Sequence, residues 1–333
     1  MAENDDVLKQ AIDWLAAGKT VGMAAVIGTW GSSPRPTGSL LAVEAGGAFV
    51  GSVSGGCIEG AVVEQALAAA RAGTTQVLDF GISDSKAWEV GLACGGEMKV
   101  LVHGAPPVDT LRRLLDARPI AAVTDMGSGA LTLVAAQGAT AGLPEETVAE
   151  ARRALAEDQS RVIPGTNRFV AVYNPPLRMV IVGAVHIAQT LAPMAAMAGF
   201  AVTVVDPRHS FATAARFPGV ALSDEWPDDA LAALQPDSRT AVVTLTHDPK
   251  LDDPALAAAL RSKAYYVGAL GSRRTHAKRV ARLQDMGFDE AAIGRIRAPI
   301  GLPLGGRRTA EIAVAVLAEA IAACYAEAHR PAA

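Results

Sequence analysis

The stretch RMVIVGAVHIAQTLAPMAAMAGFAVTVVD, residues 178–206, decides the fold of the C-terminal half. It reads as an apolar strand at 178–182, a glycine turn, a helix, a second turn at Gly199 and another apolar strand at 201–205. Residues 179–205 carry no charge, so the length alone also allows a membrane span. The Gly, Pro, His and Gln residues inside this run favour strand, turn and helix, and we expect no membrane segment.

Outward from this stretch the same alternation continues. Strand patterns recur at 240–245 and 264–267, helical patterns lie between them, and a closing helix is expected near 309–327. Strands alternating with helices form a parallel sheet. We therefore predict a Rossmann-like, doubly wound parallel sheet over residues 178–330.

Upstream, Pro175-Pro176 marks a linker at 175–177, since two prolines resist both helix and sheet pairing. Residues 1–174 mix helical and strand patterns and predict an N-terminal α+β domain, which makes the whole chain an α/β protein of two domains. The expected helices are at 7–17 and 61–71, the expected strands at 21–27, 39–43, 48–53, 76–80, 98–103 and 168–173, and the pattern at 107–158 is helix, two strands, helix.

Composition excludes several classes of protein. Of 333 residues, 50% are hydrophobic and 19% charged, so the chain is not disordered. The 30 Lys and Arg residues against 34 Asp and Glu give no positive field for nucleic acid. Three cysteines make no disulfide framework, and the acidic N-terminus has no apolar signal region. We expect a cytoplasmic protein.

The turn at 183–188 is a partial dinucleotide fingerprint. Gly183 and the acid Asp206 stand where a G-x-G-x-x-G motif and its ribose-binding acid would be, but Val185 replaces the second glycine. The pattern therefore favours the fold more than NAD(P) binding. His186 at this turn is either a site residue or a cap of its own helix.

Polar residues follow three of the predicted parallel strands. His186 follows the strand at 178–182. Asp206, Arg208 and His209 follow the strand at 201–205, and His247, between Thr246 and Asp248, follows the strand at 240–245. The carboxyl ends of parallel strands meet at one edge, where open α/β sheets bind ligands. We expect a binding site at this edge, although strand ends are commonly polar.

A second glycine-rich turn lies at 268–276. Gly271, Ser272, Arg273 and Arg274 combine accessible amides, a helix N-terminus and two guanidinium groups, which suit a phosphate. The alternative is a solvated basic helix start that continues through Lys278, Arg279 and Arg282.

Cys57 and Cys94 are both flanked by glycine pairs, whereas Cys324 reads as a small buried apolar residue of the closing helix. Cys57 lies just before a predicted helix, where the helix dipole stabilises a thiolate. Two thiolates without a C-x-x-C motif do not make a closed zinc site. Soft thiolates together with phosphate-binding turns suggest a ligand that carries a soft metal or sulfur and a phosphate.

Seven segments resemble the XdhC family of xanthine dehydrogenase accessory proteins, and together they span nearly the whole chain. They are GSSPR at 31–35, GSVSGGCIE at 51–59, WEVGLACGG at 88–96, GAVHIA at 183–188, THD at 246–248, GALGSRRTHAKR at 268–279 and APIGL at 298–302. The family pattern reads G-A-G-H at the Rossmann turn, so Val185 is a departure that weighs further against dinucleotide binding.

The resemblance implies a molybdenum cofactor chaperone rather than an enzyme. Such a protein holds molybdopterin or its cytosine dinucleotide form, protects it while an oxo ligand is exchanged for sulfur, and inserts it into an apo-molybdenum hydroxylase. The implied partners are a hydroxylase of the xanthine dehydrogenase, aldehyde oxidase or carbon monoxide dehydrogenase type, a cysteine desulfurase, and a second copy of the chain in a homodimer.

On this resemblance the site residues take roles. Cys57 and Cys94 would bind the molybdenum or its sulfur ligand. The phosphate would be held either by Ser32, Ser33 and Arg35, or by Gly271, Ser272, Arg273 and Arg274. Gly183, His186, Asp206 and His247 would complete the cofactor site.

Two other functions stay open from the sequence. An NAD(P)-dependent oxidoreductase is suggested by Gly183 and Asp206 but weakened by Val185. A cofactor-free assembly factor for a large dehydrogenase is the second alternative.

Overall fold

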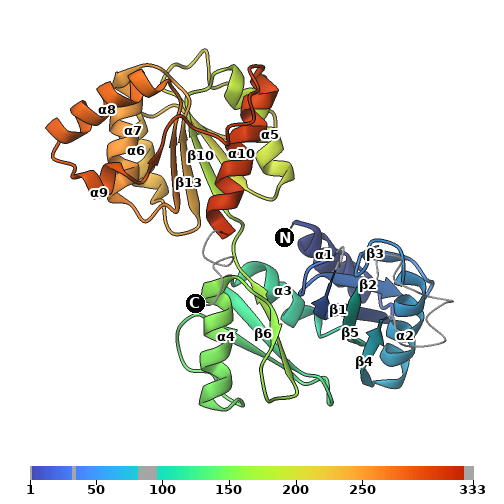
Figure 1. The fold of residues 1–333 in the computed structure, drawn as a ribbon. Coiled ribbons are helices and arrows are strands. Elements are labelled where there is room, and N and C mark those ends of the chain that lie inside the picture. Colours follow the sequence, from blue (N-terminus) through green and yellow to red (C-terminus); the bar gives the residue numbers. More distant parts are fainter. Residues whose placement is uncertain (1, 32–34, 82–95, 326–333) are drawn as a thin grey trace. The chain divides into compact units, whose positions relative to one another are not determined.

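The computed structural model describes residues 2–31, 35–81 and 96–325. It divides into two compact units, residues 1–175 and 176–333. Each unit has its own sheets and its own apolar cores, and each is described by itself (Figure 1).

The C-terminal unit is built on a six-stranded sheet in the order β12-β11-β10-β13-β14-β15, in which all neighbours are parallel. This is the 3-2-1-4-5-6 order of dinucleotide-binding folds. The strands are β10 (Arg178–Val182), β11 (Ala201–Val205), β12 (Ala221–Ser223), β13 (Thr240–Thr244), β14 (Tyr266–Ala269) and β15 (Ile296–Arg297). In the central register Val182 lies beside both Val205 and Thr244, so the loops after β10, β11 and β13 start at one edge.

Helices cover both faces of this sheet. One core cluster joins α5 and α10 to one face, and a second joins α6, α7 and α8 to the other, as Figure 1 shows. The bounds are α5 (His186–Met197), α6 (Pro227–Leu234), α7 (Pro249–Arg261), α8 (Arg273–Asp285), α9 (Glu290–Ile293) and α10 (Thr309–Tyr325). The central strands are buried on both sides, which explains their continuous apolar sequences.

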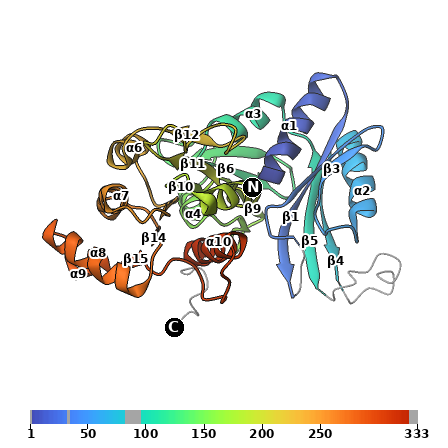
Figure 2. The same ribbon diagram turned by 90° about the horizontal axis from the view of Figure 1, so that it is seen from above.

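The N-terminal unit contains an antiparallel sheet in the order β3-β2-β1-β5-β4. Its elements are α1 (Ala2–Ala16), β1 (Val21–Trp30), β2 (Leu40–Glu44), β3 (Phe49–Gly51), α2 (Glu59–Ala72), β4 (Thr75–Phe80) and β5 (Glu97–Gly104). Residues along β1 alternate between two cores: Met23 and Ala25 face the α1 side, whereas Ala24 and Val26 face the α2 side. Figure 2 shows α1 and α2 on opposite faces of the sheet.

A second antiparallel sheet completes this unit, in the order β7-β6-β9-β8. Its elements are α3 (Val108–Asp116), β6 (Ile120–Asp125), β7 (Leu131–Ala135), α4 (Glu145–Glu157), β8 (Arg161–Val162) and β9 (Arg168–Tyr173). Residues of α4 pack on one face of this sheet. The other face shares a core with α1, α3 and the first sheet.

The predicted α/β fold, an α+β half followed by a Rossmann-like half, is confirmed. The strands at 178–182 and 201–205 have the predicted bounds. The patterns missed β8, β12 and β15, which have two or three residues each and offer too few positions for an alternation to appear. Helix α1 begins five residues before the predicted position, at Ala2 rather than residue 7, because its first turns are polar and lack an apolar periodicity. Among the described helices, none is both long and apolar enough to cross a membrane.

Candidate functional site

Cys57 lies on the loop between β3 and α2, and its side chain is exposed. Helix α2 begins two residues later, at Glu59, which is two residues before the predicted start at residue 61. The preceding Gly55 and Gly56 have φ angles of 78° and 119°, which explains the glycine pair, because other residues rarely adopt such backbone.

Glu59 organises this loop. Its carboxylate is 7% exposed and accepts five hydrogen bonds from the loop that precedes it. The Ser52 hydroxyl donates to Oε1 at 2.7 Å, and the Gly56 amide donates to Oε2 at 2.8 Å. The remaining donors are the Val53 amide, the Ser54 amide and the Ser54 hydroxyl.

Ser54 connects this carboxylate to the cysteine. Its hydroxyl donates to Glu59 and accepts from the amides of Cys57, at 3.0 Å, and Ile58, at 3.1 Å. Burial alone would raise the pKa of Glu59, but the hydroxyls of Ser54 and Ser52 and the Ser54 amide lower it to about 2. Glu59 is therefore ionised at neutral pH, and it fixes the backbone that presents the Cys57 thiol to solvent.

In the C-terminal unit, Gly183 and Asp206 come together at the end of β10. A Cβ on Gly183 would lie 2.4 Å from Cγ2 of Thr246, and its φ is +105°, so only glycine fits. Next to it, the Ala184 amide donates to Oδ2 of Asp206 at 2.8 Å. The turn therefore holds the acid directly.

Asp206 is fully buried, and its oxygens are occupied. The Arg208 guanidinium binds both of them, through Nε at 2.8 Å and Nη2 at 2.7 Å, and the Arg208 amide donates to Oδ1. Burial raises the pKa of Asp206, but the hydrogen bonds from Arg208 and Ala184 outweigh it and lower the pKa overall. The Arg208 guanidinium also lies over the Phe211 ring, 4.0 Å from its centroid.

Val185 and His186 follow Gly183 in the turn. Val185 is half-buried and packs against the apolar core, so its side chain occupies space that a second glycine would leave open. His186 is exposed and is the first residue of α5.

A basic cavity of about 330 Å³ lies near the starts of α7 and α8. Its lining residues, which define the basic cavity below, are His247, Pro249, Asp252, Arg274, Thr275, Lys278, Arg279 and Arg282. The structure thus brings together the predicted residues His247 and Arg274. Gly271, Ser272 and Arg273 do not line the cavity; Ser272 instead caps α8 by accepting from the Thr275 amide.

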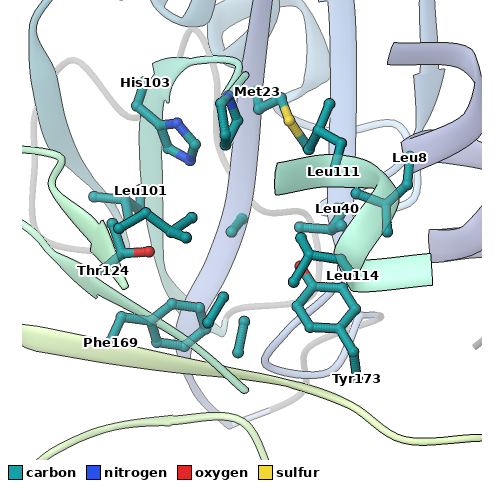
Figure 3. A pocket seen from close by; sticks show the side chains of 15 residues that line it. Leu8, Met23, Leu40, Leu101, His103, Leu111, Leu114, Thr124, Phe169 and Tyr173 are labelled. Atoms are coloured by element: carbon teal, nitrogen blue, oxygen red, sulfur yellow. The ribbon is translucent and has the colours of Figure 1, made fainter. Parts of the chain in front are cut away.

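A second, apolar cavity lies in the N-terminal unit (Figure 3) and has a volume of about 30 Å³. That volume is about the share of one water molecule in the liquid. Leu101, Leu111 and Phe169 contribute to its wall, and His103 is among its few polar residues. Burial lowers the pKa of His103, which keeps its imidazole neutral. The cavity is too small for a cofactor.

The other predicted residues have mixed outcomes. Ser32, Ser33 and Cys94 lie outside the described residues, and Arg35 is half-buried. Within residues 2–31, 35–81 and 96–325, no group of three or more His, Cys, Asp or Glu side chains could hold a metal ion. Of the two predicted metal ligands, Cys57 and Cys94, the structure therefore describes the surroundings of Cys57.

Sequence reasoning missed Glu59 and assigned no role to Asp252, Lys278 or Arg279. Glu59 had a signal, since an acidic residue in the first turn of a helix is favoured by the positive end of the helix dipole. Arg279 had none, because a fully buried arginine in a basic helix is indistinguishable by sequence from its solvated neighbours.

Two family models match this chain. The XdhC Rossmann domain matches residues 179–320, and the XdhC and CoxI family matches residues 14–81.

Curated relatives match over most of the chain. The molybdenum cofactor insertion chaperone PaoD of Escherichia coli K12 is 30% identical over 313 residues, covering 94% of this chain and 86% of PaoD. A protein of Bacillus subtilis 168 described as a probable xanthine dehydrogenase subunit is 26% identical over 316 residues, covering 90% of this chain and 92% of that protein.

A solved structure has the same fold. The crystal structure of a xanthine dehydrogenase from Bacillus halodurans superimposes with a TM-score of 0.77 at 22% identity, covering 97% of this chain and 98% of that one.

Proposed function

Because the chain belongs to the XdhC and CoxI family, we propose that it is a molybdenum cofactor chaperone that binds the cofactor and inserts it into an apo-molybdenum hydroxylase. The similarity to PaoD, 30% identity over 94% of the chain, carries this proposal. The Cys57 loop supports it, because an exposed thiol on a fixed loop suits a soft metal centre.

In this proposal Cys57, with Cys94, holds the molybdenum or its sulfur ligand. The cofactor would supply a dithiolene-bound metal, a pterin and a phosphate. Glu59 and Ser54 position the Cys57 backbone, so that the thiol needs no rearrangement to meet the cargo. Arg35 with Ser32 and Ser33, or the turn from Gly271 to Arg274, would hold the phosphate.

We further propose that the chaperone acts in the cytoplasm as a homodimer, supports sulfuration with a cysteine desulfurase, and serves a hydroxylase of the xanthine dehydrogenase class. NAD(P) is not expected to bind. The filled oxygens of Asp206 and the Val185 side chain support this expectation, because neither leaves the contacts that a ribose and a pyrophosphate need.

Cofactor retention tests the proposal. The chain and its Cys57→Ser variant are purified from a host that makes molybdopterin, and molybdenum and pterin are measured by metal analysis and mass spectrometry. We expect at least about tenfold less molybdenum in the variant, because even the loss of a residue that supports a metal ligand costs about that much affinity. Cys324→Ser, in α10, is the matched control and should retain the cofactor.

Equal molybdenum content in the wild type and the Cys57→Ser variant would overturn the assignment of Cys57. A wild-type protein that never copurifies with pterin would favour a cofactor-free assembly factor. Titration with NADH and NADPH should give no change in fluorescence, and saturable binding would instead favour an oxidoreductase.

A further inference from the structure

The basic cavity carries more positive charge than its surroundings neutralise. Four cationic side chains and one carboxylate line it. Arg282 is paired with Asp253, which is 4% exposed and accepts from both Nε and Nη2. Within the part of the chain that the structure describes, Arg274 and Lys278 have neither a salt bridge nor a side-chain hydrogen bond.

Arg279 is the central observation. Its side chain is 1% exposed, yet Nε and Nη1 have no hydrogen-bond partner. Only Nη2 is used, at 2.9 Å from the Leu270 carbonyl oxygen and 3.4 Å from Oδ2 of Asp252. Buried guanidinium groups are normally satisfied, because an unpaired buried donor costs about 1–3 kcal/mol. A buried arginine with unfilled donors in the wall of a cavity indicates a missing acceptor.

Asp252 does not fill that need. It is 2% exposed, its Oδ1 accepts from the Thr246 hydroxyl at 2.6 Å, and its Oδ2 contacts only Nη2 of Arg279, at 3.4 Å, so that Nε and Nη1 stay without a partner. The uncompensated charge in the cavity therefore comes from Arg274, Lys278 and part of Arg279. Arg274 and Lys278 lie one turn apart on the same face of α8, and Arg279 follows Lys278 on the buried side of the helix.

We propose that the basic cavity is a binding site for a diphosphate group. Several acceptor oxygens and a charge of at least two are needed to satisfy Arg274, Lys278 and Arg279 together, and neighbouring phosphates supply both. Arg274 and Thr275, in the first turn of α8, line the cavity, so the positive end of the helix dipole also favours an anion there. The volume of about 330 Å³ falls in the range of small-molecule sites.

This site is displaced from the usual nucleotide position of the fold. That position is at the carboxyl ends of the central strands, where Gly183 and Val185 follow β10 and Asp206 follows the neighbouring β11. The basic cavity instead lies between the segment after β13 and helix α8, which follows β14. The inference deepens the proposed function and rests on it in one respect: a chaperone with this site would favour the dinucleotide form of the cofactor, which contains a diphosphate bridge.

Inorganic pyrophosphate tests the cavity without any molybdenum, pterin or sulfur. We expect saturable binding of one pyrophosphate per chain in calorimetry, with a Kd below about 1 mM, and phosphate binding at least about fivefold more weakly. No saturation, or equal affinity for phosphate, would overturn the proposal.

Matched variants locate the site. Arg274→Gln and Lys278→Gln should each weaken pyrophosphate binding about tenfold, because each removes a charge-assisted contact. Lys263→Gln is the control, because it removes one exposed charge of the same unit outside the cavity. This control should change Kd less than about threefold. Equal losses of pyrophosphate binding in Lys263→Gln and Lys278→Gln would overturn the proposal.

Arg279→Lys keeps the charge but removes the planar fork of donors, and we expect it to weaken pyrophosphate binding about tenfold. If that variant does not fold, the variants at the exposed residues Arg274 and Lys278 test whether the cavity binds pyrophosphate. The two proposals can fail separately. A wild-type chain that retains molybdenum but does not bind pyrophosphate would refute only the diphosphate site. A Cys57→Ser variant that retains molybdenum and binds pyrophosphate would refute only the role of Cys57.

Discussion

Glu59 in the N-terminal unit and Asp252 in the C-terminal unit are both buried carboxylates, but their surroundings differ. Glu59 accepts five hydrogen bonds, and its pKa falls to about 2 despite burial. Burial raises the pKa of Asp252 to about 6, because the Thr246 hydroxyl and a 3.4 Å contact with Arg279 do not offset it. The number of donors decides which effect wins.

The difference separates two kinds of polar cluster. Around Glu59 both carboxylate oxygens accept hydrogen bonds from the preceding loop, so the cluster fixes the shape of the loop and presents Cys57. Around Asp252 the neighbouring Arg279 keeps two donors unused, so the cluster is incomplete without an acceptor from outside. The first is a scaffold, and the second has the chemistry of a binding site.

Glu59→Gln should break the scaffold and give the largest effect. The amide presents an NH₂ group to donors that need an acceptor, so we expect the free energy of unfolding of the N-terminal unit to fall by about 3 kcal/mol. Hydrogen exchange read by mass spectrometry assigns the loss to this unit. Glu64→Gln, on the same helix, is the control and should change stability by less than about 0.5 kcal/mol. A variant as stable as the wild type would mean that the five bonds do not hold the loop.

Replacing the Asp252 carboxylate by an amide should change the free energy of unfolding in the opposite direction. Asp252→Asn removes a charge that burial disfavours, and we expect the C-terminal unit to become about 1 kcal/mol more stable at pH 7. Pyrophosphate binding should tighten about fivefold, since a negative charge leaves the cavity. Asp285→Asn, at the exposed end of α8, is the control. A loss of more than about 1 kcal/mol in Asp252→Asn would show that the attraction to Arg279 outweighs burial, and would contradict the comparison.

The pH dependence of stability should separate the two carboxylates. The contribution of Glu59 to the free energy of unfolding is fully present above about pH 4.5 and is lost as the pH falls toward 2, because the pKa of Glu59 is lower in the folded state than in the unfolded state. Asp252 has a raised folded pKa, so its contribution is present below about pH 4 and is lost as pH rises through 6. At pH 3.5 the wild type should have lost about 1 kcal/mol more than Glu59→Gln in the N-terminal unit, allowing for solvent screening. Urea unfolding at a series of pH values measures this, and parallel curves would refute it.

The smallest effect on stability is expected at the residue of most functional interest. Cys57→Ser leaves the hydrogen bond from the residue 57 amide to Ser54 intact and changes an exposed side chain. The free energy of unfolding, measured with urea, should therefore change by less than about 0.5 kcal/mol. A larger loss would mean that the thiol is part of the scaffold. Any fall in molybdenum content would then have a structural cause.

The Rossmann half was predictable because its central strands are buried on both faces and therefore read as unbroken apolar runs, such as residues 178–182 and 201–205. Edge strands such as β12 and β15 form because neighbouring strands supply their partners, and their own residues give no comparable signal. The central strands of the sheet were therefore predictable from local sequence, whereas the short edge strands depend on pairing with their neighbours in the folded protein.

Candidate site residues were predictable where a reactive residue type stands next to residues that determine the local backbone, as for Cys57 between a glycine pair and the start of a helix. Asp206 was predicted as a cofactor-binding acid, and it lies at the expected strand end, but its partner Arg208 is only two residues away and occupies it. Arg279 could not be distinguished from Lys278 by sequence, because burial follows from how α8 packs. Which donors remain unfilled is a property of the packed structure.

Each of the five apolar cores among the described residues is made from residues of one unit, on one side of Pro175-Pro176. A substitution that weakens one core therefore acts first on its own half of the protein. Two defective copies, one damaged in each half, would still contain one intact half of each kind, and a cell that expresses both can reveal by genetic complementation whether the halves must be joined in one polypeptide to work.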